Sequence, residues 1–192
     1  MDAGIANRPY VTTELCAGFW RDIWNDGIVT LPPGARVLEI GCAEDDWQTA
    51  MLQARPDIEL VGIDWREVTR PGRTIRADVL NHDFRPAPSF DAIVAVSTIE
   101  HIGLGSYDDP LDPDGDTHTM QRCARWLKPD GFLYLDVPYR PDGPYAVTSN
   151  FRAYDEPALQ SRLIGGWRER YRRVMPAGGD GPYIALVLEK GN

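Results

Sequence analysis

A glutamate and a histidine stand side by side shortly after a continuous apolar segment, as Glu100 and His101 behind residues 91–96. The unperturbed pKa of histidine is about 6.5, so an imidazole can accept a proton near neutral pH. A positioned base of this kind accelerates reactions in which an acceptor loses its proton. We therefore predict that Glu100 and His101 are catalytic. The alternative is structural, with Glu100 capping a loop and His101 bonded to a buried carbonyl.

Glycine and carboxylate residues follow three earlier apolar segments. Gly41 follows the first, Asp64 follows the second 23 positions later, and Asp78 follows the third. A glycine lets a ligand approach the backbone closely, and an acidic residue after the second segment commonly accepts hydrogen bonds from ribose hydroxyls. Together with Ser97, which comes directly after the fourth apolar segment, these residues predict a nucleoside site.

The acidic character of the first turn decides which nucleoside fits. A dinucleotide site needs a G-x-G-x-x-G pattern and positive potential for two phosphates. Here Ala43 and Asp46 occupy the second and third glycine positions, and Glu44 and Asp45 add further negative charge. These carboxylates would repel a pyrophosphate but tolerate S-adenosylmethionine, which has no phosphate and carries a positive sulfur and an ammonium. The alternative for Asp45 and Asp46 is that they only favour the positive end of a helix.

Apolar segments that alternate with helical patterns must position these side chains. Strands alternating with helices indicate a mostly parallel sheet in a doubly wound α/β fold, which binds ligands beyond the carboxyl ends of its strands. Two successive strands at the end predict an antiparallel last strand in a Rossmann-like, seven-stranded sheet. Apolar residues at three- and four-residue spacing predict an N-terminal amphipathic helix. We expect strands at 36–40, 59–63, 74–77, 91–96, 131–137, 167–174 and 183–189, and helices at about 45–54, 113–127 and 156–164.

Length and composition fit a single domain. The chain has 192 residues, of which 43% are hydrophobic and 26% charged, and this suffices for a buried core. A net charge of −9 argues against a surface for duplex nucleic acid or anionic lipid. Three cysteines without a CxxC pair, and no membrane-spanning run or export signal, predict a cytoplasmic protein. We expect a helical cap at 1–34, a cofactor-binding core at 35–138, and a substrate-side loop, helix and terminal hairpin at 139–192.

Five segments in order resemble the successive motifs of class I S-adenosylmethionine-dependent methyltransferases. Each motif is common on its own, whereas five in order with suitable spacing are specific. Ala43 departs from the family's usual second glycine in the first motif. The segments are VLEIGCAEDDW (37–47), LVGID (60–64), RADVL (76–80), FDAIVAVSTIEHIGLG (90–105) and LKPDGFLYLDVP (127–138). The resemblance implies a cofactor site of Glu39, Gly41, Cys42 and Ala43 near the methionine end, Asp64 at the ribose, Trp65, Asp78 and Val79 at the adenine, and Ser97 beside the cofactor.

The Glu-His pair also resembles metal-dependent methyltransferases, including small-RNA 2′-O-methyltransferases and ubiquinone-pathway O-methyltransferases. Those proteins carry another glutamate about three residues earlier, where this chain has Ser97 and Thr98. A simpler account is that Asp112 caps a helix and Asp114 and Asp116 favour its positive end, so we predict no metal site. The alternative metal set is Glu100, His101 and His118. The string EHIGLGSYDDPLDPDGD (100–116) further resembles an uncharacterised methyltransferase-like group with the pattern EHxGLGxYxDPxDPxGD.

Loops near the predicted sheet edge supply candidates for acceptor binding. The glycine- and proline-rich segment 100–116 is expected to form a wall or lid of the acceptor pocket. Aromatic rings and a guanidinium can stack on or hydrogen-bond an acceptor. Equally, Arg152 can pair with a neighbouring carboxylate and the tyrosines can pack. The predicted substrate-binding residues are Tyr139, Tyr145, Arg152 and Tyr154.

Taken together, these features predict an S-adenosylmethionine-dependent methyltransferase. We expect direct displacement onto a small-molecule acceptor, at oxygen more than at nitrogen, with Glu100 and His101 near the acceptor. The alternatives are an RNA or protein methyltransferase that uses local arginines, and a non-catalytic S-adenosylmethionine-binding or scaffold protein.

Overall fold

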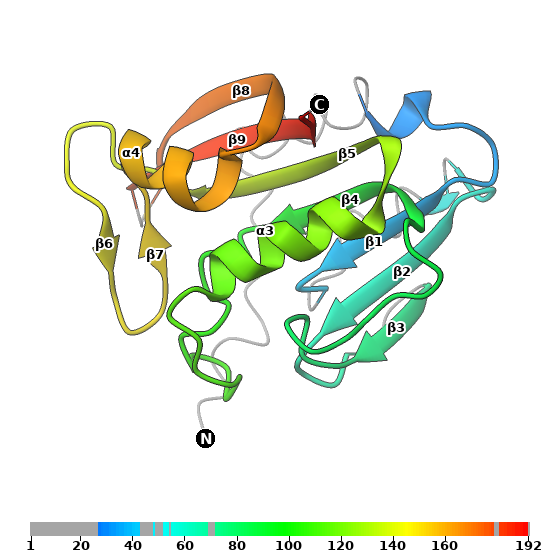
Figure 1. Cartoon of the computed structure of the whole chain (residues 1–192), viewed down its shortest axis with the longest axis horizontal. Helices are drawn as coiled ribbons and strands as arrows, with labels where there is room; N and C mark the ends of the chain where they lie inside the picture. The colour runs from blue at the N-terminus through cyan, green and yellow to red at the C-terminus, as the bar shows by residue number, and fades with distance from the viewer. Residues whose placement is uncertain are drawn as a thin grey trace.

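A computed structural model describes residues 27–42, 48, 52–53, 55–68, 72–178 and 181–191 of the chain. Three predictions fall outside these residues: the N-terminal amphipathic helix, the role of Ala43, and most of the helix expected at about 45–54. The described residues form a seven-stranded sheet with helices against it and a two-stranded sheet beside it (Figure 1).

The main sheet has the strand order β3-β2-β1-β4-β5-β9-β8. Neighbours among β1 to β5 run parallel, β9 pairs antiparallel with β5, and β8 pairs antiparallel with β9. The strand order reverses between β1 and β4, where doubly wound sheets bind ligands. The strands are β1 (Arg36–Ile40), β2 (Glu59–Asp64), β3 (Arg73–Arg76), β4 (Phe90–Val96), β5 (Leu127–Pro138), β8 (Trp167–Gly178) and β9 (Gly181–Lys190). The predicted mostly parallel, seven-stranded sheet with an antiparallel last strand is therefore confirmed.

Apolar side chains alternate between the two faces of the sheet, and each face has its own buried cluster. On β4, Ile93 and Ala95 join one cluster, whereas Ala92 and Val94 join the other. A strand is apolar throughout when both of its faces are covered, as this one is. Residues of β9 also enter both clusters, so the terminal hairpin belongs to the core of the sheet.

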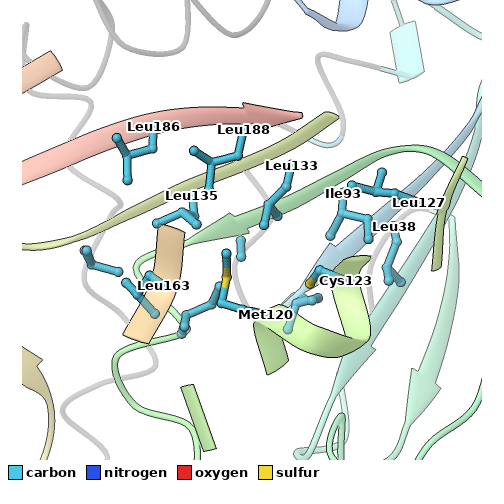
Figure 2. Close-up of a cluster of buried hydrophobic side chains, with 14 of the residues drawn as sticks. Leu38, Ile93, Met120, Cys123, Leu127, Leu133, Leu135, Leu163, Leu186 and Leu188 are labelled. Carbon is cyan, nitrogen blue, oxygen red and sulfur yellow. The ribbon is translucent and has the colours of Figure 1, made fainter. Parts of the chain in front are cut away.

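Helix α3 (Gly115–Trp126) covers one face of the sheet. Its buried residues Thr119, Met120, Cys123 and Trp126 recur at three- and four-residue spacing, which places them on one side of the helix. Figure 2 shows Met120 and Cys123 among the buried leucines of the sheet. The helix expected at 113–127 is therefore present, and its buried side contributes Met120, Cys123 and Trp126 to this cluster.

Other elements differ in detail from the sequence-based expectations. β5 begins at Leu127, directly after α3, and its pairing with β4 is irregular between Phe90 and Ala92. The helix expected at 156–164 is a short α4 (Glu156–Ala158) that continues as a π-helix, η2 (Leu159–Ile164). The remaining elements are η1 (Ile28–Thr30) and the antiparallel pair β6 (Ala146–Val147) and β7 (Arg152–Ala153).

The small sheet of β6 and β7 lies beyond the end of β5, beside the start of α3 (Figure 1). An isolated bridge joins Tyr139 to Tyr154, and Tyr154 N donates to Pro138 O at 2.9 Å. The segment 139–155 therefore stays at the edge where the parallel strands end. Within the described residues, no helix combines the length and apolarity that a bilayer crossing requires.

Candidate active site

The turn after β1 and the loop after β4 touch each other at the carboxyl edge of the sheet. Gly41 has a φ of +76° and donates its N–H to Ile63 O at 2.9 Å. A Cβ added at Gly41 would overlap the side chain of Thr98, which follows β4. Glycine suits this backbone angle and this close approach because it has no Cβ. Groups that could hold a cofactor after β1 and groups that could act on an acceptor after β4 therefore share one site.

Asp64 ends β2 at the same edge, and Arg66 pairs with its carboxylate. Asp64 Oδ1 accepts from the N–H and Nε of Arg66 at 2.8 and 3.0 Å, and Oδ2 accepts from Nη2 at 3.1 Å. The Arg66 guanidinium also lies over the ring of Tyr107, 4.7 Å from its centroid. Tyr107 belongs to the loop after β4, so this chain of contacts links Asp64 to that loop. The carboxylate predicted to bind ribose lies at the same edge of the sheet and is paired with Arg66.

The residues predicted at the adenine lie at the ends of β2 and β3. The side chain of Trp65 is exposed, and that of Val79 is buried. The carboxylate of Asp78 accepts from Leu80 N at 2.8 Å and from Asn81 Nδ2 at 2.5 Å. These bonds fix the turn after β3 and the direction of the Asp78 carboxylate. A cavity of about 370 Å³ begins beside Asp78 and is also lined by Leu80, Asp112, His118, Arg122 and Arg125.

The β1 residues predicted at the methionine end are buried. Glu39 is 4% exposed, and its Oε1 accepts from Gln48 Nε2 at 2.5 Å. A buried carboxylate with an amide donor keeps a fixed direction. Cys42 has no exposed surface, and its predicted contact with a cofactor stays a prediction.

Two buried carboxyl groups meet at Ser97, which has a left-handed φ of +42°. Its Oγ donates to Glu100 Oε1 at 2.8 Å, and its N–H donates to Asp136 Oδ1 at 2.6 Å. Burial, together with the carboxylate of Asp136, raises the pKa of Glu100 to about 8. Burial also raises the pKa of Asp136 to about 7. We refer to Glu100 and Asp136 as the acid pair.

His101 is oriented by a backbone carbonyl of the segment after β5. Its Nδ1 lies 2.5 Å from Asn150 O. A carbonyl can only accept a hydrogen bond, so Nδ1 carries the proton and Nε2 is the acceptor of the neutral ring. Nε2 lies 3.7 Å from Glu100 Oε1, and burial lowers the pKa of His101 below 6.5. The arrangement is that of a neutral base in a fixed tautomer, next to a carboxyl group.

Arg152 and Tyr154 are buried, and their polar groups bind other residues of the chain, so their predicted contact with an acceptor stays a prediction. Arg152 is 1% exposed, and Tyr154 donates its hydroxyl to Asp116 Oδ2 at 2.9 Å. Arg162 also pairs with both oxygens of Asp116, at 2.6 and 2.8 Å. Turn bonds within the loop after β4 satisfy several of its carbonyls, such as Thr98 O, which accepts from His101 N at 3.0 Å. Arg152 adds side-chain donors to the carbonyls of Glu100, Ile102, Asp112 and Pro113.

Tyr139 and Tyr145 are half-buried in the segment after β5. Tyr139 donates its hydroxyl to Glu156 Oε2 at 3.1 Å. The ring of Tyr145 lies 5.6 Å from the Arg162 guanidinium and 5.7 Å from the ring of Tyr154. Their role in acceptor binding stays a prediction.

Glu100, His101 and His118 do not assemble into a metal site. In the described parts of the chain, no three His, Cys, Asp or Glu side chains are arranged to hold a metal ion. His118 instead places Nδ1 2.7 Å from Asp112 Oδ2 at the start of α3. The alternative metal set is therefore not formed.

Sequence patterns did not assign Asp136, Asn150 or Tyr107 to this site. Asp136 is a carboxylate within the apolar run of β5, and such an interruption is a usable signal for a buried functional group. Asn150 contributes only a backbone carbonyl, which any residue type would supply. Tyr107 meets Arg66 through tertiary folding, so its role leaves no local pattern.

Solved structures with the same fold include two methyltransferases. A 1,6-didemethyltoxoflavin-N1-methyltransferase from Burkholderia thailandensis, with bound 1,6-didemethyltoxoflavin and S-adenosylhomocysteine, is 19% identical with a TM-score of 0.63 over 100% of this chain and 94% of that chain. The N-methyltransferase NodS from Bradyrhizobium japonicum WM9, in complex with S-adenosylhomocysteine, is 15% identical with a TM-score of 0.63 over 93% and 87%. The [4+2]-cyclase SpnF is 16% identical with a TM-score of 0.64 over 88% and 81%. The chain therefore has the Rossmann-like fold of class I methyltransferases.

Sequence comparison gives a partial match. A family model described as "Caenorhabditis protein of unknown function, DUF268" matches residues 74–160. This range covers the loop after β4, α3 and the segment 139–155, and it is less than half of the chain. A search of curated protein sequences found no match.

Proposed function

We propose that this protein is an S-adenosylmethionine-dependent methyltransferase that acts on a hydroxyl group of a small molecule. The main support is the contact between the glycine turn after β1 and the loop that bears Glu100 and His101. It brings candidate cofactor-binding and proton-accepting groups to one site. Structural neighbours that hold S-adenosylhomocysteine also support the cofactor. The fold alone does not select this function, because a cyclase shares it.

The described residues fit S-adenosylmethionine. The left-handed glycine turn is a cradle that a Cβ would fill, and Asp64 ends β2 as an acceptor for ribose hydroxyls. Trp65 and Asp78 lie at the neighbouring strand ends, where the adenine would bind. The acid pair favours a positively charged ligand over a phosphate, because a nearby cation stabilises ionised carboxylates. When bound, this cofactor supplies an activated methyl group.

The chain itself must align the acceptor and remove its proton. Alignment of the reacting groups alone can supply several kcal/mol of rate enhancement. His101 Nε2 is the proton acceptor in this proposal, because Nδ1 donates to Asn150 O. Arg152 contributes indirectly by binding the carbonyls on both sides of His101, which keeps the imidazole in place.

The distribution of charge supports a small acceptor rather than RNA. The net charge of the chain is −9. The arginines that alternate along β8 are neutralised by carboxylates: Arg168 and Arg170 pair with Glu189, and Arg172 pairs with Glu156 and Glu169. Binding of a polyanion depends on cations that can replace its counterions, and these arginines are already paired.

Replacement of Asp64 by alanine is expected to weaken binding of S-adenosylmethionine by about 1–3 kcal/mol, roughly 5- to 150-fold in Kd. The ribose hydroxyls would lose their charged acceptor, and titration calorimetry measures the loss. The matched control is Glu67→Ala, which removes an exposed carboxylate nearby and should leave the Kd unchanged. Equal affinities of Asp64→Ala and wild type would contradict the ribose role. If the wild type binds neither S-adenosylmethionine nor S-adenosylhomocysteine, the protein is better explained as a scaffold. If it binds only NAD, the cofactor is a different one.

Replacement of Arg66 by alanine is expected to tighten binding of S-adenosylmethionine about two- to tenfold. Arg66 occupies both carboxylate oxygens of Asp64, so a ribose must displace it before it can bind. The same calorimetric titration measures this gain. Arg76→Ala removes another exposed arginine near the same edge and serves as the control. A weaker affinity in Arg66→Ala would mean that Arg66 contacts the ligand instead of competing with it.

A further inference from the structure

We propose that the acid pair changes its protonation with the charge of the cofactor, keeping a proton beside S-adenosylhomocysteine and losing it beside S-adenosylmethionine. The inference rests on the proposed function, since it concerns the same site. It gives Asp136 the role of a positioning residue, which acts by setting the protonation of Glu100.

Both carboxyl groups of the acid pair are buried without a cationic hydrogen-bond partner in the described structure. Glu100 is fully buried and Asp136 is 7% exposed. Their side chains accept from the hydroxyl and the N–H of Ser97, and Glu100 Oε2 accepts no hydrogen bond from the described residues. Two neighbouring carboxylates in such a setting do not both ionise, because burial and mutual repulsion oppose the second charge. The pair therefore keeps a proton until a cation arrives.

The groups that face Glu100 do not supply enough positive charge to ionise it at neutral pH. Arg152, on β7, donates to the main-chain carbonyl of Glu100 and faces Asp116, with its Nε 3.8 Å from Oδ2. Its charge lowers the pKa of Glu100, but burial and Asp136 outweigh this effect. His101 lies on the same loop, and burial lowers its pKa, so it is neutral at pH 7. Tyr154 also faces Glu100 and keeps its proton, because burial raises its pKa. A cationic ligand would add the positive charge that the pair needs to ionise fully.

The cofactor proposed for this site carries a positive charge close to the pair. Ser97 bonds to both members of the pair, and the next residue, Thr98, touches the glycine turn at which the methionine end would bind. A sulfonium there stabilises the ionised pair, whereas a neutral thioether does not. The pKa values of about 8 for Glu100 and about 7 for Asp136 place this change near neutral pH.

The change in protonation balances the proposed reaction. The acceptor oxygen forms a bond to the methyl carbon, and the carbon–sulfur bond breaks with its electron pair remaining on sulfur. The acceptor proton passes to His101 Nε2 and from there to Glu100, whose Oε1 lies 3.7 Å away. The site therefore gains one proton when bound S-adenosylmethionine becomes S-adenosylhomocysteine, and this is the proton that the acceptor loses.

Titration calorimetry at pH 7.5 in two buffers of different ionisation enthalpy tests the proposal, because it counts protons exchanged on binding. Wild-type protein should release about half to one proton more with S-adenosylmethionine than with S-adenosylhomocysteine. Glu100→Gln and Asp136→Asn keep the size of each side chain and should lose this difference. Asp108→Asn, which changes an exposed carboxylate on the same loop at a φ of +61°, should retain it. The ammonium group of each ligand titrates in the same way with every variant. A change in proton release from one variant to another is therefore due to the acid pair.

The outcomes separate this inference from the proposed function. Equal proton release with both ligands in the wild type would overturn the inference and leave the function standing. An undiminished difference in both Glu100→Gln and Asp136→Asn would overturn it as well. Binding of neither ligand would overturn both. If Glu100→Gln does not fold, two measurements decide. One is the proton count with Asp136→Asn. The other is the preference of the wild type for S-adenosylmethionine over S-adenosylhomocysteine, which should rise by up to about tenfold per pH unit between pH 6.5 and 8.5.

Discussion

Replacement of His101 by alanine is expected to lower the turnover number for methyl transfer about 100-fold, the usual scale of a lost general base. The bond between Nδ1 and Asn150 O directs the lone pair of Nε2 away from that carbonyl and makes it the base. The variant should bind S-adenosylmethionine as the wild type does, because the residues predicted to bind the cofactor, Ser97 apart, lie at the ends of β1 to β3. The measurement is release of S-adenosylhomocysteine with a hydroxylated small molecule that the wild type methylates, alongside calorimetric Kd values.

A control and the pH dependence distinguish this role from a structural one. His118→Ala removes a half-exposed histidine on α3 and should leave turnover within about twofold. The pKa of His101 is lowered, so the wild-type rate should fall as pH decreases through a value below 6.5. The residual rate of His101→Ala should lack this acidic limb. Equal turnover of His101→Ala and wild type would remove the base from the mechanism.

Strand positions were predictable where burial leaves a local pattern. The segment expected at 36–40 coincides with β1 because its apolar residues are buried and a glycine turn follows. The start of β5 was not predictable in this way. Lys128–Asp130 comprise two charged residues and a proline, and they belong to the strand because Leu127 pairs with Phe90. Pairing between distant segments leaves no periodicity within either of them.

The strand ends that form the site were predictable, whereas the partners of their side chains were not. Asp136 lies beside Ser97 because β4 and β5 pair with Val96 opposite Asp136, and this register is a property of the sheet. Arg152 lies in a polar stretch of sequence that indicates exposure. It is buried because its guanidinium donates to carbonyls of the loop after β4, a contact made only in the folded chain. Motif spacing therefore located the edge of the sheet, and tertiary hydrogen bonds determined which residues are exposed there.

Replacement of Arg152 by leucine is expected to lower the free energy of unfolding by about 3–5 kcal/mol, the scale for breaking a buried ion pair from one side. The change removes one donor from each of four carbonyls and a cation beside the buried Asp116. Urea denaturation followed by circular dichroism measures the loss. Arg152→Lys should be intermediate, since an ammonium keeps the charge but cannot reach the same four carbonyls. Arg140→Leu, at an exposed position two residues after β5, should change stability by no more than about 0.5 kcal/mol.

The same variants connect stability to the proposed chemistry. Arg152 binds the carbonyls of Glu100 and Ile102, which flank His101, so Arg152→Lys should lower turnover more than it weakens cofactor binding. The glycine turn and Asp64 lie on other strands and do not depend on this guanidinium. Equal losses in turnover and in cofactor affinity would mean that Arg152 supports the whole carboxyl edge rather than the loop after β4. Stability of Arg152→Leu equal to that of the wild type would show that water can satisfy these carbonyls, and the loop would then owe its shape to its own turns.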